Sequence, residues 1–108
     1  MSQRRRRVGA LGERLAVATL RRHGLEVVAR NVSVDGGELD ILARDHGRRV
    51  VVEVRTITGL GEPLSAFNRG KAAQVARLAR RVEAHRVDLL AIRLAPDGAE
   101  IRWVRRAA

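Results

Sequence analysis

The chain has 108 residues, no cysteine, a formal net charge of +10, and one Phe and one Trp as its aromatic residues. These values predict one globular domain, exclude disulfides and thiolate metal sites, and argue against a protein that stacks single-stranded bases on aromatic side chains. No apolar run is long enough for a membrane span or a signal peptide, so we expect a cytoplasmic protein without a membrane partner. The excess of 22 Lys and Arg over 12 Asp and Glu indicates a polyanionic partner, most often nucleic acid.

The chain starts with a basic segment, residues 1–8, which contains four consecutive arginines. A charge run at a chain end is either a solvated tail or a flexible arm that contacts phosphates, and both readings stay open. We therefore expect a flexible basic arm over residues 1–8 and a single domain over residues 9–108.

Apolar residues at helical spacing predict a first helix from Leu11 to about His23, which Gly24 ends. Glu13 shares the face of the apolar residues one turn further along this helix. It is therefore either an acidic residue in the first turn, where it favours the helix dipole, or a residue that lies near the carboxylates described below. A first strand is predicted over residues 25–34.

The central feature is a predicted β-hairpin over residues 36–56. Polar and apolar residues alternate along both halves, which is typical of strands with one apolar face. With residues 46–47 at the centre of the turn, Leu42 lies opposite Val51. A shift of one residue would move every side chain to the other face, so the pattern specifies this register.

The same register brings two carboxylates together, because Asp40 then lies opposite Glu53. Like charges opposite each other destabilise a sheet. A divalent cation between them, Mg²⁺ or Mn²⁺, would remove this repulsion, since hard cations bind carboxylate oxygens. Glu38 is expected opposite Arg55, where it forms an ion pair or assists the metal.

Residues 57–70 are rich in glycine and predict a loop before a second helix from about Asn68 to about His85. Ser65 or Asn68 is expected to cap this helix. Lys71 lies at the edge of its apolar stripe, from where it can point over the sheet. Given the net charge, we expect the basic residues of this helix to contact phosphates rather than only to be solvated: Arg69, Lys71, Arg77, Arg80 and Arg81.

Two more strands are predicted over residues 88–94 and 100–104, the last of them at an edge of the sheet. The element order is then α-β-β-β-α-β-β. This order predicts an α/β fold in which helices pack on a mixed sheet.

Several motifs met along the chain resemble those of the YraN family of small bacterial proteins. They are GALGERLA near the start, the pair Arg30-Asn31, GGELDIL, VVVEVRT, the loop over residues 61–63 and Lys71. The resemblance covers residues 9–94, and the YraN family is similar to the PD-(D/E)XK nuclease superfamily and, within it, to archaeal Holliday junction resolvases. It implies a restriction-endonuclease-like core, a mixed sheet flanked by helices with the acidic motif on adjacent strands.

Carried over position by position, the resemblance implies metal binding by Asp40 and Glu53, helped by the backbone carbonyl of Val54 and by Glu13. Arg55 stands where that family has a lysine. Because arginine is always protonated, Arg55 cannot accept a proton from water. It can still stabilise negative charge that develops on a phosphorus centre.

Two functional hypotheses follow from these residues. The first is a Mg²⁺-dependent endonuclease that hydrolyses phosphodiesters of DNA, including branched DNA. The second is a nucleic-acid-binding module that keeps the nuclease fold without catalysis, which Arg55 in place of lysine supports. A protein-interaction subunit is a third class, and DNA binding with little salt dependence would favour it. Junction resolvases act as dimers, so the resemblance also implies a homodimer.

Overall fold

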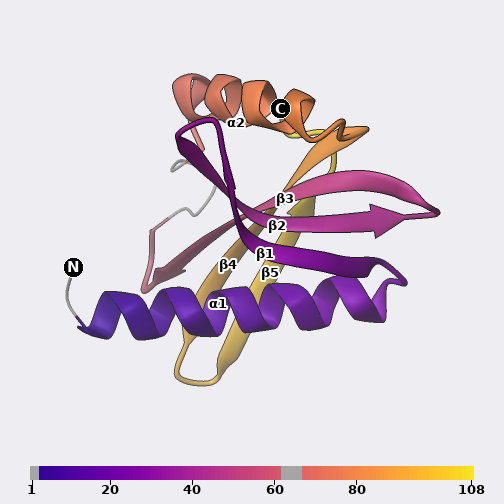
Figure 1. The fold of residues 1–108 in the computed structure, drawn as a ribbon. Coiled ribbons are helices and arrows are strands. Elements are labelled where there is room, and N and C mark those ends of the chain that lie inside the picture. Colours follow the sequence, from indigo (N-terminus) through magenta and orange to yellow (C-terminus); the bar gives the residue numbers. More distant parts are fainter. Residues whose placement is uncertain (1–2, 62–66) are drawn as a thin grey trace.

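The computed structural model describes residues 3–61 and 67–108. Within these ranges, five strands form one sheet in the order β1-β2-β3-β4-β5, with α1 and α2 on opposite faces (Figure 1). The elements are α1 (Gln3–Arg22), β1 (Glu26–Val34), β2 (Gly37–Asp45), β3 (Arg48–Thr58), α2 (Arg69–Arg81), β4 (Arg86–Ala95) and β5 (Gly98–Val104). The predicted α/β layout and element order are confirmed, and β5 lies at an edge as expected.

The sheet is mixed because α2 carries the chain across it between two parallel strands, β3 and β4. All other neighbouring strands are antiparallel. Alternation along β3 supplies both faces of the sheet with apolar side chains. Val50 and Val52 pack in the core beneath α1, whereas Val51 packs in the core beneath α2. The strand that carries Glu53 and Arg55 is therefore central and held from both sides.

The first helix starts well before the position that the apolar periodicity predicts. α1 begins at Gln3 rather than near Leu11, so residues 3–8, expected in a flexible arm, are helical here. Their mobility in solution stays a prediction. Further along, α1 touches the sheet closely at Gly12, where a Cβ atom would collide with the side chain of Thr56 on β3. This contact sets the start of α1 beside the end of β3 (Figure 1).

The predicted register of the β2–β3 hairpin is confirmed. Leu42 pairs with Val51, and Asp45 pairs with Arg48 around a two-residue turn. Both turn residues have positive φ, 51° at His46 and 81° at Gly47. This is the backbone of a type I′ turn, which matches the twist of the strands it joins.

The second helix begins as predicted and ends earlier. Asn68 caps α2, since its side chain accepts a hydrogen bond from the amide of Lys71 at 2.9 Å. The alternative cap, Ser65, lies outside the described residues. α2 ends at Arg81 instead of near His85. None of the helices in the described part of the chain has the length and apolar character needed to cross a membrane.

A buried carboxylate fastens the end of the chain to the sheet. Asp88 on β4 is fully buried, and it accepts hydrogen bonds from the Arg86 guanidinium at 3.0 Å and from the Trp103 indole at 2.9 Å. The backbone amide of Arg106 donates a third, at 3.1 Å. These donors satisfy the buried charge, so Asp88 is a structural residue that the strand pattern did not single out.

Candidate nucleic-acid interface

Asp40 and Glu53, here called the acidic pair, lie together where β2 and β3 stop pairing. The backbone ladder between these strands ends at Ile41 and Val52. Beyond it, the amide of Asp40 donates to Glu53 Oε2 at 2.9 Å, and the amide of Val54 donates to Asp40 Oδ2 at 2.8 Å. Carboxylates thus replace backbone carbonyls as acceptors, so the strands separate here. The predicted juxtaposition of the acidic pair is confirmed, whereas its role stays a prediction.

The regular alternation of side chains between the two faces of the sheet is interrupted at Asn31 on β1 and at Asp40 on β2. Ile41 packs beneath α1, but Leu39 packs beneath α2, although residues two apart share a face in a regular strand. The neighbouring position on β1, Asn31, has a positive φ of 53°, which asparagine tolerates better than most residues. The switch brings the Asp40 side chain to a cavity beside α1.

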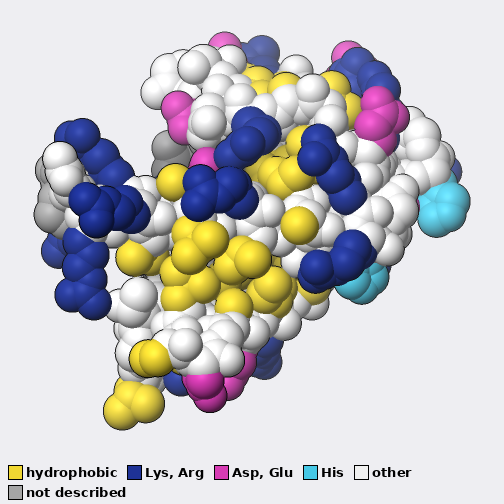
Figure 2. Space-filling view, turned by 90° about the horizontal axis from the view of Figure 1, so that it is seen from below, with side chains coloured by type: hydrophobic (Ala, Val, Ile, Leu, Met, Phe, Trp, Pro, Cys, Tyr) yellow, Lys and Arg dark blue, Asp and Glu magenta, His cyan; other side chains and the backbone are white. Residues whose placement is uncertain are grey.

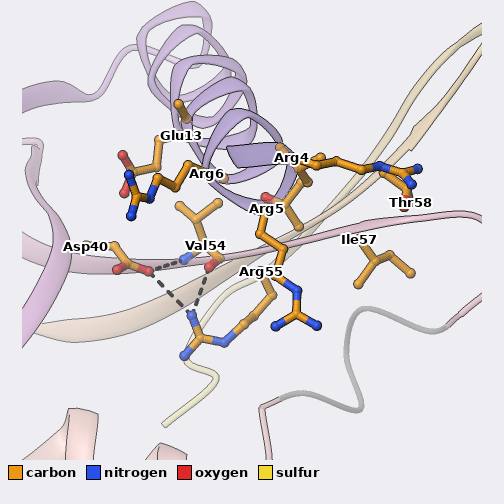
Figure 3. A pocket seen from close by; sticks show the side chains of 13 residues that line it. Arg4, Arg5, Arg6, Glu13, Asp40, Val54, Arg55, Ile57 and Thr58 are labelled. Carbon is orange, nitrogen blue, oxygen red and sulfur yellow. Dashed lines mark hydrogen bonds and ion pairs between the residues drawn. The ribbon is translucent and has the colours of Figure 1, made fainter. Parts of the chain in front are cut away.

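Arg55 places its guanidinium against both members of the acidic pair. Its Nη1 donates to the carbonyl oxygen of Val54 at 2.9 Å and lies 3.6 Å from Asp40 Oδ2 (Figure 3). Its Nη2 lies 3.9 Å from Glu53 Oε1. The guanidinium carbon also lies 6.0 Å from the ring centre of Phe67, within reach of a cation–π contact. Arg55 is therefore held in place by groups on several sides.

Glu53 is the most deeply buried charged group of the site, with 2% of its side chain exposed. Burial, and then repulsion from the Asp40 carboxylate, raise its pKa to about 7. The positive charges of Arg55 and Lys71 oppose this rise. Glu53 does not itself line the cavity described below, but its partner Asp40 does, and a carboxyl group with a perturbed pKa next to such a cavity is typical of functional sites.

A cavity of about 830 Å³ opens between the start of α1 and the end of β3 (Figure 3). Arg55, Asp40 and Glu13 line it together with three basic residues from the first turns of α1, here called the N-terminal arginines: Arg4, Arg5 and Arg6. The α1 face of the molecule shows basic side chains around an apolar area (Figure 2). The cavity thus combines positive charge with two carboxylates. From the sequence, residues 1–8 were considered only as a solvated tail or a flexible arm, and not as part of a cavity.

Glu13 reaches this cavity from α1, as one of the two readings of the sequence expected. It lies ten residues into the helix, so the alternative of an acidic first-turn residue is wrong. Its carboxylate pairs with Arg30 of β1 at 3.5 Å. Glu13 therefore shares the cavity with Asp40 while its charge is compensated by another strand.

Glu38 does not have the partner that the sequence predicted. It is exposed and pairs along the backbone with Ser33 of β1. The ion pairs of Arg55 within the described residues go to the acidic pair instead. The prediction failed because it extended the regular β2–β3 ladder beyond the point where the strands separate.

The predicted basic residues of α2 lie on the opposite face of the sheet from α1 (Figure 1). Lys71 is near enough to the acidic pair for its charge to lower the pKa of Glu53. Arg81 pairs with Asp35 at 2.6 Å. The other predicted residues are exposed on the helix surface: Arg69, Arg77 and Arg80. The structure thus brings Lys71 to the site, and contact of the arginines with nucleic acid stays a prediction.

The predicted metal ligands, the acidic pair and the Val54 carbonyl, do not fit Mg²⁺ or Mn²⁺ in this arrangement. Across residues 3–61 and 67–108, no three His, Cys, Asp or Glu side chains are grouped so that they could hold a metal ion. The oxygens that would bind the ion face the guanidinium of Arg55, whose charge is permanent. A divalent ion there would meet a fixed positive charge.

Comparison with known sequences places the chain in a family. The profile of the Uncharacterised protein family UPF0102 matches residues 12–92. The chain belongs to the UPF0102 family. A UPF0102 protein of Beutenbergia cavernae is 44% identical over 95 residues, which cover 79% of this chain and 80% of that one. Another, of Syntrophotalea carbinolica, is 36% identical over 111 residues, which cover 94% and 90%. The YraN-like resemblance seen in the motifs is confirmed.

A solved structure shares the fold of this UPF0102 protein. It is the crystal structure of a FdxN element excision controlling factor protein from Anabaena variabilis, with a TM-score of 0.56 and 25% sequence identity. The alignment covers 74% of this chain and 65% of that chain, so this chain spans just under two thirds of its neighbour's length. The mixed sheet with flanking helices therefore recurs in an experimental structure.

Proposed function

We propose that this UPF0102 protein binds nucleic acid, with DNA as the favoured form, by its sugar–phosphate backbone at the cavity between α1 and β3. The lining of that cavity carries the proposal, because the N-terminal arginines and Arg55 converge on one concave surface. Phosphate contacts from Arg and Lys supply most of the affinity of sequence-independent binding. The net charge of +10 would draw a polyanion to this surface.

The start of α1 offers a second reason to expect an anion there. The amide dipoles of a helix make its N-terminus positive, and acidic residues commonly compensate this charge. The first turn of α1 contains no acidic residue, and arginines occupy it instead. Phosphates at this end would relieve the accumulated positive charge and accept hydrogen bonds from the arginines.

Phosphodiester hydrolysis is the second candidate, and the acidic pair is the observation that favours it. Carboxylates repel phosphates, so a protein that only binds gains nothing from them. A bound Mg²⁺ would polarise a phosphate and lower the pKa of a bound water. With Arg55 in its observed position, the acidic pair and the Val54 carbonyl do not fit this ion, so binding without hydrolysis is the favoured function.

The proposal is tested by fluorescence anisotropy with labelled duplex, single-stranded and four-way-junction DNA, in EDTA and over a range of salt concentrations. We expect affinity to fall steeply with salt, by about 0.9 in the log–log slope for each phosphate contact on duplex DNA. Tighter binding of the junction would support the branched substrate, and a two-to-one protein stoichiometry would support the homodimer that the resemblance implies.

The matched variants lie on the same helix. Arg5 and Arg6 replaced by glutamine should weaken binding and lower the salt slope by up to about 2. Arg21 and Arg22 replaced by glutamine change the charge equally, about 24 Å further along α1, and should have a smaller effect. Equal loss in both variants would mean that only overall charge matters and would contradict a site at the cavity. Cleavage of the same DNA with Mg²⁺ would move hydrolysis to first place.

A further inference from the structure

The guanidinium of Arg55 occupies the place between the strands where positive charge is needed. Three oxygens surround it: the Val54 carbonyl at 2.9 Å from Nη1, Asp40 Oδ2 at 3.6 Å from Nη1, and Glu53 Oε1 at 3.9 Å from Nη2. These atoms come from both strands of the opening, and they are the oxygens that a hard cation would select.

The surroundings hold the side chain there. Arg55 is 19% exposed and Glu53 is 2% exposed, so the contact is largely shielded from water. The ring of Phe67 lies 6.0 Å from the guanidinium carbon. The acidic pair itself is fixed, because each carboxylate also accepts a backbone hydrogen bond across the opening. Arg55 therefore meets a preformed acceptor set, and its planar fork can face two carboxylates at once.

We propose that Arg55 is the permanent cation of this site and excludes divalent metals from it. A guanidinium compensates one negative charge of the acidic pair and stays charged at every accessible pH. A divalent cation would have to displace the guanidinium from its acceptors or lie against its positive charge, and either arrangement is unfavourable. The site of this chain therefore works without a metal, and removal of the Arg55 charge creates a divalent-cation site from the acidic pair and the Val54 carbonyl.

The test is Mn²⁺ binding to the full chain without nucleic acid, followed by electron paramagnetic resonance and calorimetry. Wild type should show only weak, non-saturable Mn²⁺ binding. Arg55→Ala should gain one saturable Mn²⁺ site, with an affinity at least about tenfold above that residual binding of wild type. Adding Asp40→Asn to that variant should remove the gain. Arg69→Ala is the matched control, since it removes an exposed arginine from α2 and should behave as wild type.

The proposal fails if wild type binds one Mn²⁺ as tightly as Arg55→Ala and loses it on Asp40→Asn. It also fails if Arg55→Ala is folded by circular dichroism yet gains no site. Should that variant not fold, Arg55→Gln replaces it, since its longer neutral side chain keeps contact with Phe67. Because no nucleic acid is present, failure here leaves the binding proposal to be judged by its own experiment.

Discussion

Because the carboxyl group of Glu53 is buried, we expect the free energy of unfolding to depend on pH in a specific way. Its pKa rises from 4.5 to about 7 on folding, first because burial disfavours the charge and then because Asp40 repels it. The folded state therefore keeps this proton longer than the unfolded state. The contribution of Glu53 to the free energy of unfolding is greatest below about pH 4.5, falls as pH rises through about 7, and is level above that.

The size of the effect follows from the shift. A rise from 4.5 to about 7 corresponds to about 3 kcal/mol, at about 1.4 kcal/mol per pKa unit. Glu53→Gln removes the titration and keeps an oxygen that can accept from the Asp40 amide. The free energy of unfolding of Glu53→Gln minus that of wild type should therefore increase by about 2 to 3 kcal/mol as pH rises from about 5 to about 8.

Urea unfolding of both proteins at several pH values, with EDTA present, measures this difference. Taking the difference cancels groups common to both, including Asp45, whose pKa is lowered chiefly by its hydrogen bond to Arg86. Glu100→Gln is the control, because it removes an exposed carboxylate on β5. If the free energies of unfolding of wild type and Glu53→Gln changed with pH in parallel, ionisation of the buried Glu53 would not destabilise the folded state, and the account would be refuted.

Further predictions concern the framework of the site and are all measured by urea unfolding. Gly12→Ala should lower the free energy of unfolding by about 1 to 3 kcal/mol, because the new Cβ atom collides with β3. Gly9→Ala places its Cβ atom in open space and should raise the free energy of unfolding by about 0.5 to 1 kcal/mol. Equal effects of the two variants would contradict close contact at Gly12. Asp88→Asn should cost about 1 to 3 kcal/mol, since it removes the buried negative charge that accepts from Arg86, Trp103 and the Arg106 amide while Asp45 still pairs with Arg86, and no measurable loss would contradict this network. Asn31→Ala should cost about 1 kcal/mol and Asn31→Gly little, because of the positive φ; the reverse order would contradict it.

The position of the acidic pair could be predicted because local rules determine it. Period-two alternation gives the faces of each strand, and His46 and Gly47 form a turn that fixes the register of the hairpin. The register then brings Asp40 and Glu53 together without further information. Asn68 as the cap of α2 was predictable for the same reason, since it depends on a few adjacent residues.

The separation of β2 from β3 could not be predicted from alternation. A period-two pattern assumes a regular strand, and the sequence alone does not reveal the positive φ of Asn31 or the carboxylates that replace backbone acceptors. The partners of Arg55 and Glu38 depend on this separation, so the expected pair between them was wrong. The roles of the site residues stay predictions.

The extent of α1 was missed for a different reason. Apolar periodicity begins near Leu11, and a run of arginines carries no such pattern, although arginine is a good helix former. From the sequence alone, residues 4–7 were therefore interpreted only as a solvated tail or a flexible arm. Their helical conformation is what brings the N-terminal arginines to the cavity.

The most direct test of the central claim is to locate bound DNA residue by residue. Backbone amide chemical shifts of the labelled protein would be followed by NMR during titration with a short duplex in EDTA. We expect the largest changes in residues 3–9 and 54–58 and at Asp40, with little change at the hairpin turn or along β5. Changes confined to the outer surface of α2, or spread evenly over the molecule, would contradict a nucleic-acid site at the cavity between α1 and β3.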